Sequence, residues 1–326
     1  MEKYDLIIIG GSAAATAAGI YAARRNLNFK IISKDFGGEV ATSGEVDNYP
    51  GLPDTDGLTL AEKFKKHLAD YGVEPELGVE VEKIEKLEDG TFCLTAKKDG
   101  PPAMAAEKLT EDSEKMLKCD YAAKAVIVAT GVHPRELNVP GEKELRNKGV
   151  SYCTVCDGPL FKDKIVTIVG GGNSALEAGI MMAAVASKVY MVNKNPVFKG
   201  EQVLMDNLMK SKNVEVIYNA KTTEISGDGF VSGLKYKDQD GQEQELKVEG
   251  VFIHIGMLPN SGLVPVGVEK TNFGEIVVSK NCETGIPGLF AAGDVTDIPF
   301  KQIVISAGQG TCALLQAVNY LNRLNQ

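Results

Sequence analysis

Two cysteines separated by two residues, Cys153 and Cys156, carry the clearest chemical signal in the sequence. This spacing is typical of a dithiol that forms a disulfide and is readily reduced again. If the pair opens a helix, the N-terminal N–H groups and the helix dipole favour a thiolate. Asp157 follows directly, and its carboxyl group can supply the proton that a departing thiolate requires; its alternative role is an ordinary turn residue.

The same spacing also occurs in half of a zinc site, which requires two further ligands. The remaining cysteines are scattered singly, and none stands beside a second Cys or His: Cys93, Cys119, Cys282 and Cys312. The pattern therefore favours a redox dithiol over a metal site, with inert buried thiols as the third alternative. We expect no metal, and we expect Cys282 and Cys312 to be packing or surface residues.

Two glycine-rich turns each follow an apolar run that is typical of a strand in a parallel sheet. They read Gly10-x-Ser12-x-x-Ala15 and Gly170-x-Gly172-x-x-Ala175. The dinucleotide-binding pattern is Gly-x-Gly-x-x-Gly or Ala, so the second turn matches it fully. The first has Ser12 at the middle position, where a small residue lets the backbone approach a pyrophosphate. The alternative for either turn is tight helix–strand packing without a ligand.

Bulk properties exclude several classes of protein. The chain has 326 residues, enough for about two domains, and a formal net charge of -9 without a basic cluster, which argues against nucleic-acid binding. No apolar run approaches the roughly 18 residues of a membrane span. Residues 1–5 lead directly into a strand and lack a signal-peptide pattern, so we expect a cytoplasmic protein whose cysteines are thiols rather than a disulfide framework.

The order of predicted elements indicates an α/β fold with two doubly wound, Rossmann-like nucleotide-binding domains, the second inserted into the first. Residues 6–9, 12–25 and 29–33 form a strand–helix–strand unit, and residues 165–169, 173–186 and 189–192 form another. The sequence predicts an outer domain of residues 1–133 and 252–326 and an inner domain of residues 134–251. An amphipathic helix is predicted over residues 59–70, and residues 97–118 are predicted to be an exposed excursion without chemistry of its own.

Taken together, these segments resemble the low-molecular-weight thioredoxin reductases over nearly the whole chain. The segments that carry the resemblance occur in the order of the family: Gly37-Gly38-Glu39, residues 45–51, Ala129-Thr130-Gly131, residues 153–158, residues 170–177, Gly293-Asp294 and Lys301-Gln302-Ile303. The resemblance implies FAD in the outer domain, a pyridine nucleotide in the inner domain and a homodimer that reduces thioredoxin or a thioredoxin-like protein.

The resemblance also implies roles for individual residues. Cys156 is expected to meet the flavin, Cys153 to attack the disulfide of the partner, and Asp157 to act as acid and base. Asp294 is expected to bind the ribityl–phosphate region. The residues expected to contact FAD are Gly10, Ser12, Ala13, Lys34, Gly38, Glu39, Asn48, Thr130, Gly131, Gly293, Asp294, Lys301, Gln302 and Ile303. Those expected to contact the pyridine nucleotide are Gly170, Gly172, Asn173, Ser174, Glu177, Lys194 and Lys199.

One segment departs from the family. The NADPH-dependent members carry arginines after the second strand of the inner domain, where the guanidinium fork grips the 2′-phosphate. This chain has Lys194 and Lys199 there and no Arg, and no acidic residue at the strand end for an NAD ribose. The lysines are either point charges for a phosphate or solvated surface residues. NADPH, NADH and a ferredoxin therefore all remain candidate electron donors.

The sequence is also compatible with two other functions. A ferredoxin–NADP reductase-like flavoprotein generally lacks a dithiol, so Cys153 and Cys156 argue against it. A redox sensor would use the dithiol without flavin-dependent turnover. We assign no role to His67, His133 or His254, because none is near the dithiol in the sequence.

Overall fold

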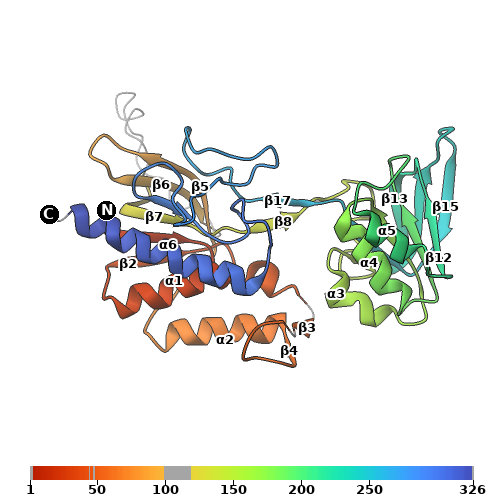
Figure 1. Ribbon diagram of the computed structural model, residues 1–326, viewed down its shortest axis with the longest axis horizontal. Coiled ribbons are helices and arrows are strands. Elements are labelled where there is room, and N and C mark those ends of the chain that lie inside the picture. Colours follow the sequence, from red (N-terminus) through yellow and green to blue (C-terminus); the bar gives the residue numbers. More distant parts are fainter. Residues whose placement is uncertain (1–2, 44, 47, 99–118, 325–326) are drawn as a thin grey trace. The chain divides into compact units, whose positions relative to one another are not determined.

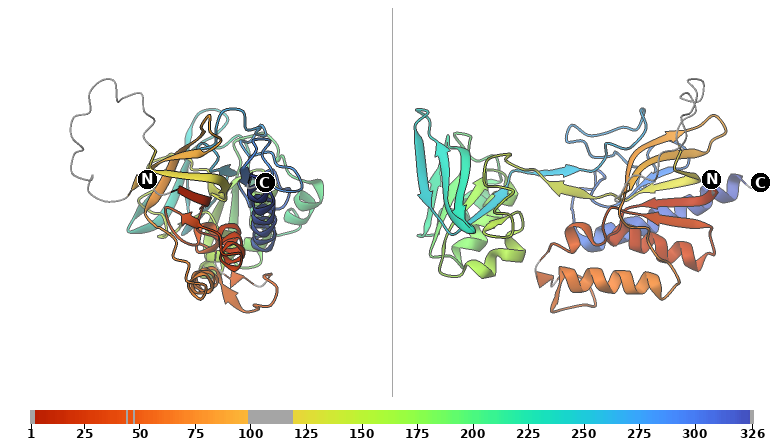
Figure 2. Two further views of the ribbon diagram at one scale, coloured as in Figure 1. Left: turned by 90° about the vertical axis from the view of Figure 1, so that its left-hand side faces the viewer. Right: turned by 180° about the vertical axis from the view of Figure 1, so that it is seen from behind.

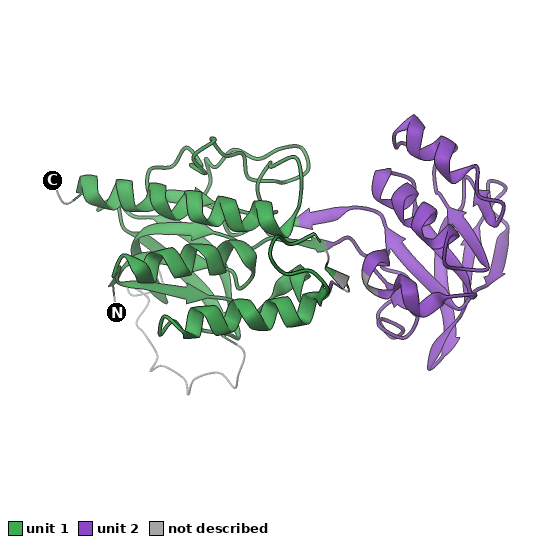
Figure 3. Ribbon diagram, turned by 60° about the horizontal axis from the view of Figure 1, so that its bottom comes forward, with its two compact units in different colours: residues 1–42, 46–133, 259–326 green, residues 43–45, 134–258 purple. Residues whose placement is uncertain are grey.

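The computed structural model describes residues 3–43, 45–46, 48–98 and 119–324. The chain divides into two compact units (Figure 3). Unit 1 comprises residues 1–42, 46–133 and 259–326, and unit 2 comprises residues 43–45 and 134–258. Unit 1 is thus formed by both ends of the chain. The paired strands β8 (Val132–Pro134) and β17 (Met257–Pro259) lie where the chain passes between the units (Figure 1).

Unit 1 is a mixed sheet with helices on one face. The helices are α1 (Ala13–Arg24), α2 (Gly57–Ala69) and α6 (Ile303–Leu324), with the short 3-10 helix η1 (Gly38–Val40). The strands are β1 (Lys3–Ile9), β2 (Phe29–Ile32), β3 (Glu45–Val46), β4 (Thr55–Asp56), β5 (Val79–Lys86), β6 (Phe92–Lys98), β7 (Tyr121–Val128) and β18 (Leu289–Ala291). The main sheet has the order β2-β1-β7-β6-β5, with β18 beside β7.

Strand β1 explains how this sheet is covered on both faces. Leu6 and Ile8 pack with α1 and α6, whereas Ile7 and Ile9 pack into a second core with β5 and β6. Because successive strand residues point to opposite faces, a continuous apolar run is what a doubly covered strand requires. Helices α1 and α6 run side by side beneath the sheet (Figure 1). In α2 the predicted stripe of Leu60, Phe64 and Leu68 is buried.

Unit 2 contains a parallel sheet, helices and a small antiparallel sheet. The parallel sheet has the order β12-β11-β10-β16-β9, and the antiparallel sheet is β13-β14-β15. Figure 2 shows the unit from two further sides. The strands are β9 (Val150–Ser151), β10 (Ile165–Gly170), β11 (Lys188–Val192), β12 (Val214–Ile217), β13 (Lys221–Asp228), β14 (Phe230–Lys237), β15 (Glu243–Lys247) and β16 (Gly250–His254). The helices are α3 (Thr154–Asp157), η3 (Gly158–Phe161), α4 (Asn173–Ala183) and α5 (Gln202–Leu208).

The predicted α/β class with two nucleotide-type domains is confirmed, but the second domain boundary differs from the prediction. The sequence assigned residues 252–258 to the outer domain. In the structure, β16 pairs in parallel with β10, with Phe252 opposite Ile168, and unit 2 extends to residue 258. The hydrophobic pattern of a segment predicts that it is a strand. It does not predict which strand, distant in the sequence, will pair with it. In the described part of the chain, no helix has the length and apolar character needed to span a membrane.

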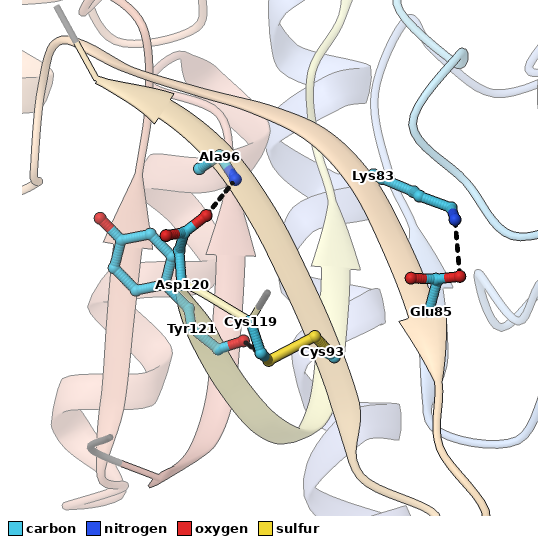
Figure 4. The surroundings of a disulfide bond; sticks show 7 residues. All are labelled: Lys83, Glu85, Cys93, Ala96, Cys119, Asp120 and Tyr121. Carbon is cyan, nitrogen blue, oxygen red and sulfur yellow. Dashed lines mark hydrogen bonds and ion pairs between the residues drawn. A yellow bond between two sulfur atoms is a disulfide. The ribbon is translucent and has the colours of Figure 1, made fainter. Parts of the chain in front are cut away.

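The cysteines also differ from expectation, because Cys93 and Cys119 form a disulfide in unit 1 (Figure 4). The two are 26 residues apart in the sequence, so they look isolated. Strand β6 and strand β7 are antiparallel neighbours, with Cys93 opposite Ala122. The chain that leaves β6 must return beside it, which brings Cys119 to Cys93. Residues 99–118, most of the predicted excursion, lie outside the described residues.

Candidate active site and cofactor sites

The first glycine turn is built tightly into unit 1. Gly10 has a φ of 135°, and a Cβ there would overlap the carbonyl oxygen of Ala129. Helix α1 begins directly after the turn, with Ala13, Ala14 and Ala15 buried. Their N–H groups have no acceptor among the described residues, although buried backbone donors are normally paired. A buried helix N-terminus of this kind favours an anionic group such as a pyrophosphate.

The segment Gly293-Asp294 lies at the same place. A Cβ on Gly293 would lie 3.2 Å from the Cβ of Ala14. Ser306, in the first turn of α6, donates a 2.8 Å hydrogen bond to Asp294 Oδ1. Burial raises the pKa of the Asp294 carboxyl, and the Ser306 hydrogen bond opposes that shift. The structure thus brings together the first glycine turn, the segment Gly293-Asp294 and the start of α6, which in the sequence were connected only through the family resemblance.

Further predicted flavin residues surround the same turn. The Ser12 hydroxyl donates to the Gly37 carbonyl over 2.6 Å, and Gly38 follows at the exposed start of η1 with Ser12 beside it. The Asn48 amide donates to Gln302 Oε1 over 3.1 Å, just before Ile303 begins α6. The serine at the middle fingerprint position therefore has a structural use, since its hydroxyl holds the neighbouring loop.

Thr130 and Lys301, which are also predicted to contact the flavin, form a hydrogen-bonded pair and an ion pair, respectively, within the protein. Thr130 and Asn260 exchange two hydrogen bonds, and Gly131 next to them has a φ of 63°. Lys301 forms an ion pair with Glu275 at 2.8 Å.

Two other predicted flavin residues lie on the surface. Lys34 pairs with Glu80 at 3.2 Å. Glu39 is exposed and accepts a hydrogen bond from Thr42.

The dithiol region begins at the end of β9 in unit 2. Cys153 is disulfide-bonded, and its N–H donates a 3.0 Å hydrogen bond to Ser151 Oγ. Cys156 lies in α3, but its side chain is outside the described atoms. Asp157 ends α3, donates its N–H to the Cys153 carbonyl, and is half-buried. As the N-cap of η3, it makes no side-chain hydrogen bond to that helix.

His254, to which we assigned no role from the sequence, contacts the first residue of the dithiol helix α3. His254 Nε2 is 2.6 Å from the hydroxyl of Thr154, the residue after Cys153. Burial lowers the pKa of His254 to about 4, so the imidazole is neutral at physiological pH. Its backbone lies opposite Gly170 in the sheet. The carboxyl ends of parallel strands meet at one edge, so the pairing of β16 with β10 brings His254 beside the glycine turn, but the sequence does not show that pairing.

Glu142 is a second residue that the sequence analysis missed. It is fully buried and accepts hydrogen bonds from the N–H groups of Leu137 and Asn138 and from the hydroxyl of Tyr152, all between 2.6 and 2.8 Å. Burial and the contact with Glu142 raise the pKa of Tyr152, which directly precedes Cys153. A buried carboxylate with several donors is held rigidly, so it anchors the segment that leads into the dithiol.

The second glycine turn opens α4. A Cβ on Gly170 would overlap the carbonyl oxygen of His254, whereas one on Gly172 would meet nothing within 4 Å. Gly172, Asn173, Ser174 and Glu177 are all exposed. Asn173 and Glu201 exchange two hydrogen bonds of 2.8 and 2.9 Å, which ties the loop after β11 to this turn.

The loop after β11 holds the two lysines predicted to face the nucleotide. Lys194 and Lys199 are exposed, and neither has an ion-pair partner among the described residues. Asn193, at the strand end, is buried, and its amide hydrogen bonds stay within the loop, to Val197 and Asn195. Both lysines are therefore available to an anionic ligand, while Asn193 is committed to the loop itself.

A family model described as pyridine nucleotide-disulphide oxidoreductase matches residues 4–311. The chain belongs to this family. It resembles a subunit of the alkyl hydroperoxide reductase of Escherichia coli (strain K12), with 40% identity over 324 residues that cover 99% of this chain and 59% of that protein. A protein of the same name in Staphylococcus aureus (strain MRSA252) is 38% identical and is covered to 60%. The chain thus spans about 60% of the length of these relatives.

Solved structures with the same fold are titled as thioredoxin reductases. That of T. acidophilum is 36% identical with a TM-score of 0.72, and the alignment covers 99% of this chain and 100% of that one. That of Streptococcus pyogenes MGAS5005 is 35% identical with a TM-score of 0.73, covering 98% and 99%. A ferredoxin-flavin thioredoxin reductase from Clostridium acetobutylicum is 30% identical with a TM-score of 0.52, covering 100% and 99%.

The resemblance predicted from the sequence is therefore confirmed, and so are FAD and a pyridine nucleotide as the cofactors of the family to which the chain belongs. The description of the family names a pyridine nucleotide and a disulfide as the groups between which its members transfer electrons. The unit 1 turn fits the FAD pyrophosphate because its buried N–H groups lack acceptors among the described residues. Which individual side chains contact the cofactors remains a prediction.

Proposed function

We propose that the chain is the flavin-dependent reductase of a thioredoxin-fold protein, with a pyridine nucleotide as electron donor and Cys153 and Cys156 as the exchanging pair. The observation that carries this proposal is the position of the dithiol segment. Strand β9 leads straight into Cys153 at the same edge of the sheet as the glycine turn after β10. His254 joins these two places, through Thr154 and through its pairing with Gly170.

The protein residues would act in the following order. FAD, when bound, supplies a two-electron carrier between the nucleotide and the dithiol. The Cys153 thiolate attacks one sulfur of the partner disulfide and expels the other as a thiolate, which Asp157 protonates. Cys156 gives its proton to the Asp157 carboxylate and attacks the Cys153 sulfur, which expels the second partner thiolate. That thiolate takes the proton from Asp157, so the partner leaves as a dithiol and a disulfide joins the two enzyme cysteines. The half-buried carboxylate of Asp157 suits this proton transfer because it directly follows Cys156 in the sequence.

Replacing the attacking thiol tests this assignment. Cys153→Ser is expected to keep its flavin absorbance and its reduction by nucleotide, but to lose more than ~1,000-fold in reduction of the protein partner, since no nucleophilic thiol remains. Cys312→Ser is the matched control and is expected to keep partner reduction. Full activity of Cys153→Ser on its protein acceptor would overturn the assignment.

Thioredoxin is one candidate for the partner, and the named relatives suggest a second. Because the chain is 40% identical to a subunit of an alkyl hydroperoxide reductase, a disulfide-containing peroxide-reducing protein is the other candidate. Anaerobic stopped-flow mixing of the prereduced enzyme with each oxidised protein distinguishes them. The physiological class should be reduced at a rate that matches turnover, and the other class at least ~10-fold more slowly.

The donor is proposed to be NADPH or NADH with only weak discrimination between them. The exposed lysines Lys194 and Lys199 can attract a 2′-phosphate as point charges, but no bidentate Arg is present and no carboxylate is available for a ribose diol at the end of the described strand β11. Anaerobic titration with each nucleotide should bleach the flavin at stoichiometric amounts. If neither bleaches it while a reduced ferredoxin does, the donor proposal is wrong. The homodimer implied by the resemblance is tested separately, by sedimentation of the yellow protein.

A further inference from the structure

A second pair of cysteines, distinct from the dithiol of unit 2, meets inside unit 1. Cys282 and Cys312 are both free thiols. Cys282 Sγ donates to the carbonyl of Gln309 over 3.6 Å, and Cys312 Sγ donates to the carbonyl of Lys280 over 3.7 Å. Each thiol therefore reaches the backbone of the other's segment, and Cys312 packs against the core cluster that contains Cys282 and is in hydrogen-bond contact with the Cys282 thiol.

The conformation at Cys282 holds it in this place. Its φ of 64° is left-handed, a conformation that residues other than glycine rarely adopt. The turn that contains it is closed by the hydrogen bond from its own N–H to the Ser279 carbonyl, and its carbonyl accepts from the N–H of Ala291, the last residue of β18. The backbone of the turn is thus fixed on both sides, and the thiol is directed at α6 by its hydrogen bond to the Gln309 carbonyl.

The two thiols differ in access. Cys282 is 2% exposed, whereas Cys312 is half-buried on α6. Burial and the contact with Cys312 raise the pKa of Cys282 to about 12, so Cys282 stays protonated. An oxidant from solvent therefore meets Cys312 first, and Cys282 is placed to resolve the product.

The chain between these cysteines contains the closing segment of the flavin site. Residues 283–311 include β18, Gly293-Asp294 and the start of α6. Gln309 connects the two places directly, because its carbonyl accepts from Cys282 while its side-chain oxygen accepts from the N–H of Gly293 over 2.8 Å. A covalent bond between Cys282 and Cys312 would therefore close a loop around the part of unit 1 that completes the flavin site.

We propose that Cys282 and Cys312 form an oxidation site for hydroperoxides, and that the disulfide formed there locks the flavin-binding segment. The Cys312 sulfur attacks the terminal oxygen of the hydroperoxide, giving Cys312 sulfenic acid and the alcohol. The Cys282 sulfur then displaces the hydroxyl group, and the Cys282 proton leaves with it as water. The sum is two thiols and one hydroperoxide giving one disulfide, one alcohol and one water. The proposal goes beyond the reductase function and does not depend on it.

The experiment uses the FAD-loaded chain with Cys153→Ser and Cys156→Ser, so that the exchanging dithiol cannot take part. After treatment with tert-butyl hydroperoxide, peptide mapping without reduction should show Cys282 joined to Cys312, with the Cys93–Cys119 disulfide unchanged. FAD release in moderate urea, followed by flavin fluorescence, should become on the order of tenfold slower, because the bond removes loop freedom. Dithiothreitol should restore the original rate.

Cys312→Ser in the same background is the matched control and should show neither the bond nor the slower release. Phenylarsine oxide, which bridges two adjacent thiols, gives a second measurement that needs no oxidation. It should bind one equivalent in the background protein and none in the Cys312→Ser variant. The proposal is overturned if Cys312 ends as a sulfinic acid with Cys282 still a free thiol, or if the bond forms without slowing FAD release.

Discussion

The two glycine turns share one sequence pattern but lie in different environments. At the turn after β1, Gly10 and Ala13 are buried, and the N–H groups at the start of α1 lack acceptors among the described residues. At the turn after β10, Gly172 and Asn173 are exposed, where water can satisfy the same groups. Buried donors need a resident partner, whereas exposed donors do not. The difference is what a permanently held cofactor and an exchanging co-substrate would each require.

The largest expected effect comes from adding one methyl group to each turn. Gly10→Ala places a Cβ against the Ala129 carbonyl at a positive φ, which should cost about 3 kcal/mol or more and yield little yellow protein. Gly172→Ala meets no atom within 4 Å, so the protein should fold, stay yellow and only weaken nucleotide binding, roughly tenfold. Flavin content per chain and the KM for nucleotide measure both effects. Equal loss of flavin in the two variants would remove the distinction between the turns.

The second prediction concerns pH and unit 2. The pKa of His254 is lowered from 6.5 to about 4, so between these pH values the unfolded chain binds a proton that the folded chain does not. Stability from this group is therefore complete above pH 6.5 and is lost as pH falls toward 4, up to about 3 kcal/mol. His254→Gln should flatten the fall in thermal midpoint over this range. The hypothesis fails if wild type and variant have parallel pH profiles.

The third prediction concerns the Asp294 carboxylate in the proposed FAD site of unit 1. Asp294→Asn keeps the shape of the side chain but removes the negative charge, which Ser306 contacts. FAD should therefore bind about 30-fold more weakly, which corresponds to the loss of one hydrogen bond to a charged group. Asp297→Asn is the control, because Asp297 accepts from the Val278 N–H at 3.1 Å and belongs to the neighbouring loop. Fluorescence titration of FAD into the deflavinated proteins compares them. Loss of FAD affinity of the same size in the control would show that only the loop had been disturbed.

The smallest expected effect is at the exposed turn. Lys194→Ala and Lys199→Ala should each raise the KM for NADPH by about three- to fivefold and leave that for NADH within about twofold, as expected of exposed point charges. Raising the salt concentration should reduce the difference in wild type. A Lys194→Ala protein with the same increase for both nucleotides would show that the lysine does not read the 2′-phosphate.

Much of the architecture follows from local pattern. The apolar runs of β1 and β10, the stripe on α2 and the glycine turns each depend on neighbours within a few residues, so they can be recognised in the sequence. The dithiol was found for the same reason, whereas the flavin-type segments were found through the resemblance to a known family. The boundary at residue 258 could not be found in this way, because it depends on β16 pairing with β10, a strand distant in the sequence.

Three features of the side chains were decided only by the tertiary structure. His254 meets Thr154, Cys93 meets Cys119, and Cys282 meets Cys312 only because sheet pairing and helix packing bring distant segments together. In sequence each is a single residue without a neighbour of its kind. The chain's residue types and short spacings therefore determined which chemistry it carries. The long-range contacts decided which lone residues take part in it, because burial and proximity are properties of the folded chain.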